Sequence, residues 1–150
     1  LPAFARANPL GCGVNPAGSL VVLAGRPALG TELVLGLDNP LGTQAAGSLG
    51  TLVTARRADA HHPCGTLLPG LGMDGGPGEW LLRREATMLV DVRAVGALTA
   101  GAPVSAALAL PAAPILIGHH FFVQGALHDT RPVAPVPWGL TTALELTIGL

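Results

Sequence analysis

Short apolar runs separated by glycine and proline dominate this chain. Apolar and polar positions alternate most clearly over residues 140–148, where Leu144, Leu146 and Ile148 point one way and Glu145 and Thr147 the other. Such a period of two is typical of a β-strand with two different faces. The pattern predicts strands over residues 19–24, 31–37, 49–55, 66–68, 79–92, 103–110, 115–127 and 140–148.

Two of these predicted strands have alternative interpretations. Residues 79–92 have the propensity of a helix, but their second half alternates between glycine- and proline-rich turns, which favours a strand. Residues 115–127 form a long strand that we expect to be kinked or bulged at Gly118. About seven to nine short strands at regular spacing predict an all-β fold: an antiparallel β-sandwich of jelly-roll or immunoglobulin-like type.

Composition narrows the class further. The chain of 150 residues has 21 Gly and 14 Pro without a period of three, which excludes collagen. Hydrophobic residues make up 49% and charged residues 11%, against about 25% charged in average proteins. Prolines and glycines interrupt the long uncharged stretch at 94–118, so we expect no membrane-spanning helix. This excess of apolar residues indicates that part of the surface meets another protein.

The charges are few and balanced. Eight arginines and no lysine stand against nine acidic residues, which gives a formal net charge of −1. No basic face is available to neutralise phosphates, so nucleic acid is not expected as a partner. A net charge near zero also removes one defence against self-association.

Cys12 and Cys64 are the two cysteines. The chain begins at Leu1 rather than Met, so we expect a secreted protein that has lost a signal peptide, extracellular or at the cell surface. In that setting an even pair predicts a disulfide, worth roughly 4 kcal/mol for a loop of this length. The alternative is two buried thiols in a cytosolic protein, and the turn-rich sequence around both cysteines favours the bridge.

Several phrases resemble an uncharacterised domain family of secreted bacterial proteins, of planctomycete type. They are NPAGSL at 15–20, LDNPLGTQ at 37–44, PCG at 63–65 and GLT-ALELTIG near the end, so the resemblance covers about residues 11–150. It implies export, a β-sandwich and the Cys12–Cys64 bridge, and it implies no activity. Members are usually appended to larger proteins, whereas here the domain stands alone with about ten extra residues in front.

Those extra residues suggest how copies of the chain meet. We divide the chain into an extended segment at 1–10, in which Pro2 and Pro9 exclude a helix, and one β-sandwich domain at 11–150. The segment could act as a donor strand that pairs with a sheet edge of the next subunit, anchored by Leu1, Phe4 and Leu10. Such head-to-tail contacts give fibres.

Candidate chemistry is sparse. His119 and His120 are adjacent on a strand and face opposite sides, so they cannot share one ion without a bulge. His61 and His62, in a loop that could approach His128 and Asp129, are weak candidates for metal ligands. No serine sits in a G-x-S-x-G motif, and a bridged cysteine is not a nucleophile. We therefore expect no enzyme activity, no metal and no cofactor.

Trp80 is the candidate for a ligand contact, because sugar-binding surfaces use exposed aromatic rings and this chain has few, but a tryptophan of the core or of a sheet edge is the favoured interpretation. The sequence leads to one main hypothesis: an extracellular structural protein whose copies assemble into a cell-surface filament or sheath through β-strand contacts. The alternative is a monomeric adhesion or carbohydrate-binding module, with glycans as its partner.

Overall fold

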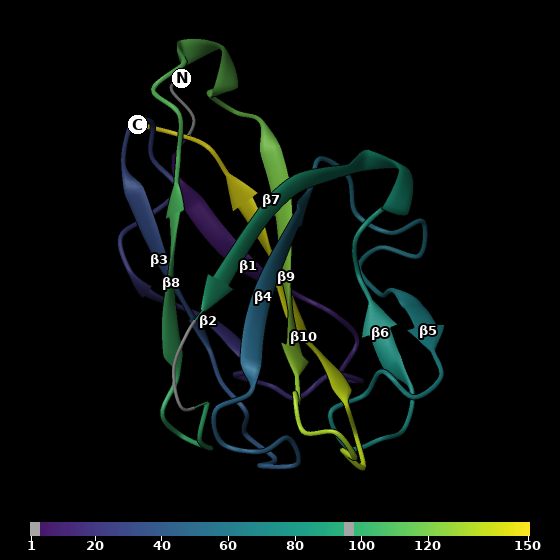
Figure 1. The fold of residues 1–150 in the computed structure, drawn as a ribbon. Helices are drawn as coiled ribbons and strands as arrows, with labels where there is room; N and C mark the ends of the chain where they lie inside the picture. The colour runs from purple at the N-terminus through teal and green to yellow at the C-terminus, as the bar shows by residue number, and fades with distance from the viewer. Residues whose placement is uncertain (1–3, 95–97) are drawn as a thin grey trace.

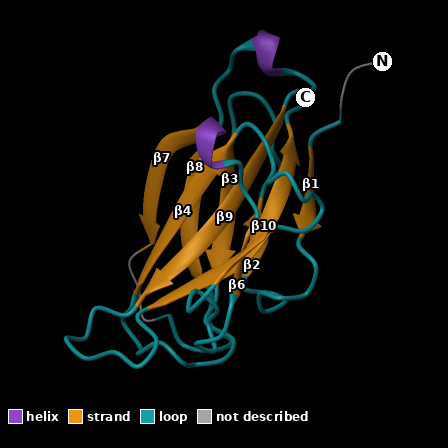
Figure 2. Ribbon diagram, turned by 90° about the vertical axis from the view of Figure 1, so that its right-hand side faces the viewer, coloured by secondary structure: helices purple, strands orange, loops and turns teal. Residues whose placement is uncertain are grey.

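The computed structural model describes residues 4–94 and 98–150, with backbone only over residues 86–94. One antiparallel sheet has five strands in the order β1 (Arg6–Leu10), β10 (Trp138–Thr147), β9 (His120–His128), β4 (Leu49–Ala55) and β7 (Thr87–Ala94). A second antiparallel sheet has the order β2 (Leu20–Ala24), β3 (Glu32–Leu37) and β8 (Val104–Ala109). The two sheets pack face to face as a β-sandwich (Figures 1 and 2), which confirms the predicted fold class.

A small hairpin and two 3-10 helices complete the described elements. The hairpin consists of β5 (Thr66–Leu68) and β6 (Gly78–Trp80), and it lies beside the five-stranded sheet in Figure 1. The 3-10 helices are η1 (Arg84–Ala86) and η2 (Pro114–Leu116). With β1 and the two halves of the disputed segment counted, the described residues contain ten strands.

The main core lies between the two sheets. Leu33, Leu35 and Leu37 of β3 have no exposed surface and pack against Leu52 and Val123 of the facing sheet. Alternate residues of β3 therefore carry the contact, as the period of two predicts. Position 125 of β9 needs a glycine at this contact, because a Cβ atom there would collide with the Leu37 side chain.

A second core covers the outer face of the five-stranded sheet. Ala55, Phe122 and Ala143 of that sheet pack against Leu81 and Leu82, which follow the β5–β6 hairpin. The five-stranded sheet is thus buried on both faces along part of its length. A strand covered on both sides loses the clean alternation of apolar and polar residues.

The predicted single strand at 79–92 is wrong. The chain forms β6 up to Trp80, then passes through a short bridge between Ala58 and Leu82 and through η1, and only then begins β7 at Thr87. Leu81 and Leu82 are both buried in the second core, so this stretch packs against the sheet instead of continuing along it.

The other predicted strands are confirmed within a residue or two, with one exception. Strands β4 and β5 have the predicted bounds, and the last strand begins two residues earlier, at Trp138. The exception is 115–127, whose first residues form η2 and whose strand starts at His120. Gly118, where we expected a kink within this strand, lies with φ of 82° in the turn between η2 and β9, so the strand does not pass through it.

Candidate functional site

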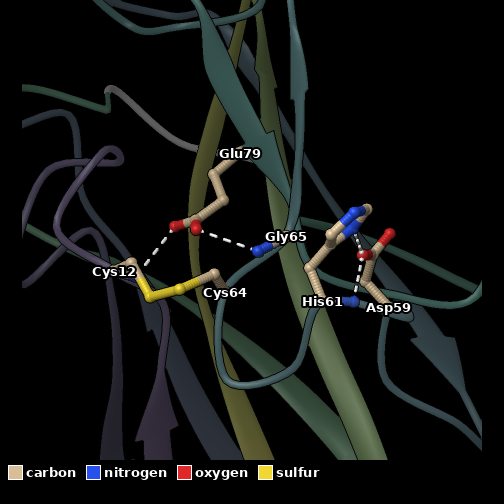
Figure 3. Close-up of a disulfide and its surroundings, with 6 residues drawn as sticks. All are labelled: Cys12, Asp59, His61, Cys64, Gly65 and Glu79. Atoms are coloured by element: carbon tan, nitrogen blue, oxygen red, sulfur yellow. Dashed lines mark hydrogen bonds and ion pairs between the residues drawn. A yellow bond between two sulfur atoms is a disulfide. The ribbon is translucent and has the colours of Figure 1, made fainter.

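The Cys12–Cys64 disulfide is formed, with 5.0 Å between the two Cα atoms. It ties the segment after β1 to the loop before β5. Figure 3 shows the carboxylate of Glu79 beside it, accepting hydrogen bonds from the backbone N–H groups of Cys12 (3.0 Å) and Gly65 (2.9 Å). A buried carboxylate thus joins the same two segments as the disulfide.

Buried amide side chains extend this polar centre into the sheet. Asn15 and Gln124 both donate to the carbonyl oxygens of Glu79 and Thr141, at 2.7–2.9 Å. The register of β10 shifts between Leu140 and Ala143, and such a bulge leaves backbone groups outside the ladder. The two amides bind the Thr141 carbonyl at this bulge and the Glu79 carbonyl of β6, so they attach β6 to β10.

The predicted metal ligands do not come together. His61 hydrogen-bonds to Asp59 at 2.8 Å, His62 lies edge-on to the ring of Phe122, and the ring of His128 stacks on Trp138. Asp129 binds Arg131. Within the described ranges, the one group with ligand-like spacing is Cys12, Cys64 and Glu79, and a disulfide offers no thiolate to a metal.

Asp59 closes the His61 turn. Its partial burial raises the pKa, but hydrogen bonds from the His61 backbone, the Thr66 hydroxyl and the His61 ring outweigh that effect and lower the pKa overall. The carboxylate is held by its own loop, and Figure 3 shows it beside the disulfide region.

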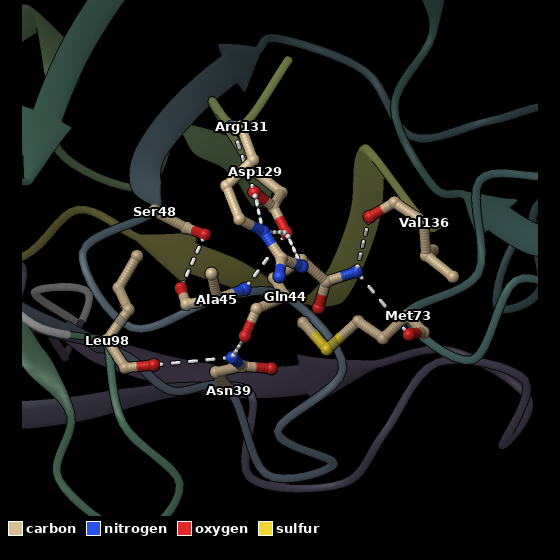
Figure 4. Close-up of polar contacts among 9 residues, drawn as sticks. All are labelled: Asn39, Gln44, Ala45, Ser48, Met73, Leu98, Asp129, Arg131 and Val136. Carbon is tan, nitrogen blue, oxygen red and sulfur yellow. Dashed lines mark hydrogen bonds and ion pairs between the residues drawn. The ribbon is translucent and has the colours of Figure 1, made fainter. Parts of the chain in front are cut away.

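Asp129 organises the loops at the opposite end of β9 (Figure 4). Its buried carboxylate accepts from the backbone N–H of Ala45 at 3.0 Å and from the guanidinium of Arg131 at 2.7 Å. Hydrogen bonding to Arg131 is the main reason that the pKa of Asp129 lies far below its ordinary value. The same contact raises the pKa of Arg131.

Two buried amides from the LDNPLGTQ phrase complete this loop cluster. Asn39 donates to the carbonyl oxygens of Gln44 and Leu98, and Gln44 donates to those of Met73 and Val136. These bonds connect four loops that are distant in the sequence (Figure 4). The LDNPLGTQ segment at residues 37–44 therefore holds these loops together through its buried amides.

The structure places the two tryptophans in different surroundings. Trp80 is half-buried and packs against the second core. Trp138 is the exposed one, at 43%, and its ring lies parallel to that of His128 with 4.1 Å between ring centroids. Sequence reasoning missed this pair because nothing in the spacing of residues 128 and 138 shows that they face each other across β9 and β10.

Of the three residues predicted to anchor assembly, the structure describes two, and these two differ in exposure. Phe4 is 79% exposed, Leu10 is buried in the second core of its own chain, and Leu1 lies outside the described residues. Residues 6–10 form β1, which pairs antiparallel with β10 of the same chain. Donation of this segment to another subunit remains a prediction.

The edges of the three-stranded sheet carry no charge. Strand β2 has the sequence LVVLA and β8 has VSAALA. In β2, Val22 and Leu23 are 38% and 45% exposed. Natural edge strands usually carry lysine, proline or a charged side chain that prevents pairing with another chain, and both of these strands have none.

No protein-family model matches the chain, and no significant match was found among curated proteins or among solved structures. None of the described helices has the length and apolar character needed to cross a membrane. The fold and the disulfide define the class of protein: a disulfide-linked β-sandwich in which the edge strands of the three-stranded sheet carry no charge.

Proposed function

We propose that this protein is an extracellular structural subunit that assembles with copies of itself through the edges of its three-stranded sheet. The observation that carries the proposal is the uncharged β2 edge, with Val22 and Leu23 exposed. An exposed apolar edge offers unpaired backbone groups and side-chain contacts to a second strand.

The disulfide and the sparse charge support the compartment and the mode of assembly. Disulfides persist in oxidising surroundings such as the extracellular space. If β2 of one copy meets β8 of the next, each copy keeps one free edge, and such contacts repeat into an open filament. Exchange of β1 between copies is a second route, because the chain leaves this edge strand through Gly11 directly before the Cys12 anchor.

Val22→Lys tests the edge contact. A lysine on β2 would place a charge against the partner strand, so we expect the concentration needed for assembly to rise at least about tenfold, or about 1.4 kcal/mol per contact. The measurement is sedimentation of assembled protein across a concentration series.

The matched control is Val133→Lys. Val133 is 90% exposed in the proline-rich loop after β9, far along the chain from the β2 edge. It should leave assembly unchanged. Equal assembly by the wild type and Val22→Lys would overturn the edge contact.

The second candidate is a carbohydrate-binding or adhesion module, favoured by the Trp138–His128 stack. One face of the Trp138 ring is covered by His128 while the side chain stays partly exposed, so its remaining surface is a candidate platform for a sugar ring. Saturable binding on a glycan panel, lost in Trp138→Ala, would move this function to first place; no binding would remove it.

A further inference from the structure

An apolar cavity of about 240 Å³ lies between the sheets at the end where η2 and the C-terminus are found in Figure 1. Its walls come from both sheets and from η2, and Thr54 is the one polar residue among them. The main apolar lining residues are Leu108, Leu110, Leu116, Phe121, Leu146 and Ile148. Apolar cavities of this kind stay dry and take up apolar molecules.

A groove of opposite character adjoins this cavity. It has a volume of about 580 Å³ and is lined by Arg56, Arg57, His119 and His120, together with Phe121. Phe121 lines both spaces, so the cavity and the basic groove share a wall. An apolar space and a cationic surface thus meet at one side chain.

An arginine follows directly on the end of the strand pairing. The register of β4 and β9 ends with Ala55 opposite Phe122, and β4 ends at Ala55. The next residue along the chain, Arg56, lines the groove together with Phe121, at the point where β4 leaves the sandwich.

The guanidinium groups of Arg56 and Arg57 are open to a ligand. Both residues are exposed, and neither makes a salt bridge or side-chain hydrogen bond to the residues whose side chains are described, 4–85 and 98–150. Glu145 lies opposite Phe122, on the sheet face away from the cavity, and its carboxylate is 3.3 Å from the ring of His120, a residue of the groove. Its partner there is His120 and neither of the two arginines.

From this arrangement we infer that the end of the sandwich binds a small amphipathic carboxylate, with its aliphatic chain in the cavity and its carboxylate at Arg56 and Arg57. Arginine forms paired, charge-assisted hydrogen bonds with carboxylates. A cavity of about 150 Å³ holds benzene, so 240 Å³ fits, by proportion, a chain of about eight to ten carbons. This site is independent of the assembly proposed above.

Calorimetric titration with octanoate and with octan-1-ol tests the two halves of the site. We expect saturable binding of octanoate at one site, about tenfold tighter than octanol, because the alcohol lacks the charge. The Arg56→Gln, Arg57→Gln double variant should weaken octanoate about tenfold and leave octanol unchanged. Arg26→Gln is the control, since Arg26 lines neither space.

Two further measurements test whether the aliphatic chain occupies the apolar cavity. Leu116→Trp on η2 should fill the cavity and weaken both ligands, with circular dichroism verifying that the variant is folded. Independently of any variant, the octanoate methyl group should give nuclear Overhauser contacts to the methyl groups of Leu108 and Leu146. Absence of octanoate binding, absence of those contacts, or equal binding of octanoate by the wild type and the double arginine variant would each overturn the inference.

Discussion

At the scale of single residues, buried polar side chains fix the loops of this protein. Asp129 carries the strongest case, because it is 2% exposed and binds the backbone of Ala45 and the guanidinium of Arg131 at once. A charge buried in this way is tolerated because each of its oxygens receives hydrogen bonds. The contribution of such a group to stability depends on its ionisation.

Asp129→Asn should destabilise the protein at pH 7 and somewhat less at pH 3. The folded-state pKa of Asp129 is depressed, so its ionised form stabilises the fold above the unfolded pKa of about 3.9, and this stabilisation is lost as the pH falls toward the folded value. Urea unfolding at both pH values measures the difference. Asp74→Asn, at an exposed turn, should show no comparable gap; a gap for Asp129→Asn that stays constant with pH would contradict the account.

At the scale of elements, Glu79 links β6 to the disulfide-bearing loops. Its side chain is 1% exposed and accepts two backbone N–H bonds, while its own backbone is held by Asn15 and Gln124. The sequence predicted the disulfide but not the neighbouring Glu79 carboxylate. A single glutamate in a turn-rich segment has the sequence pattern of an ordinary surface residue. Its importance follows from the fold around the β5–β6 hairpin, which brings residues 12, 65 and 79 together.

Glu79→Gln should lower the free energy of unfolding by about 1–3 kcal/mol, because one carboxylate oxygen becomes an NH₂ group that faces a backbone N–H. Glu32→Gln, the same change at an exposed position of β3, should cost less than about 0.5 kcal/mol. Denaturant unfolding of the oxidised proteins gives both values. Equal stabilities of the two variants would show that the Glu79 carboxylate is not a structural link.

At the scale of the whole molecule, the sequence predicted most of the strands and the two-sheet packing, since turn residues and short apolar runs are local signals. It did not predict the pairing of β1 with β10, which joins residues 6–10 to residues 143–147. It also failed at residues 81–86, where Leu81 and Leu82 pack on the outer face of the five-stranded sheet and interrupt the predicted strand, whereas β7 begins at Thr87 in the part where the sequence alternates. The basic groove combines Arg56 and Arg57 with His119 and His120, and only the register of β4 and β9 brings these pairs together.

The edge strands and the low charge of the whole molecule bear on its proposed function. Two uncharged edge strands, a net charge of −1 and a charged fraction of 11% leave little to oppose contact between copies. A disulfide-linked sandwich is also rigid enough to keep its edges in a fixed orientation, so contacts can repeat with the same geometry. These features together support a subunit whose function is its assembly.

The central claim is tested most directly by negative-stain electron microscopy of the native protein, prepared without denaturing steps. The account predicts ordered filaments of uniform width, absent in Val22→Lys at the same concentration and present in Val133→Lys. Isolated small particles in the wild type at every concentration tested would contradict self-assembly, and would leave the Trp138 surface as the leading candidate for function.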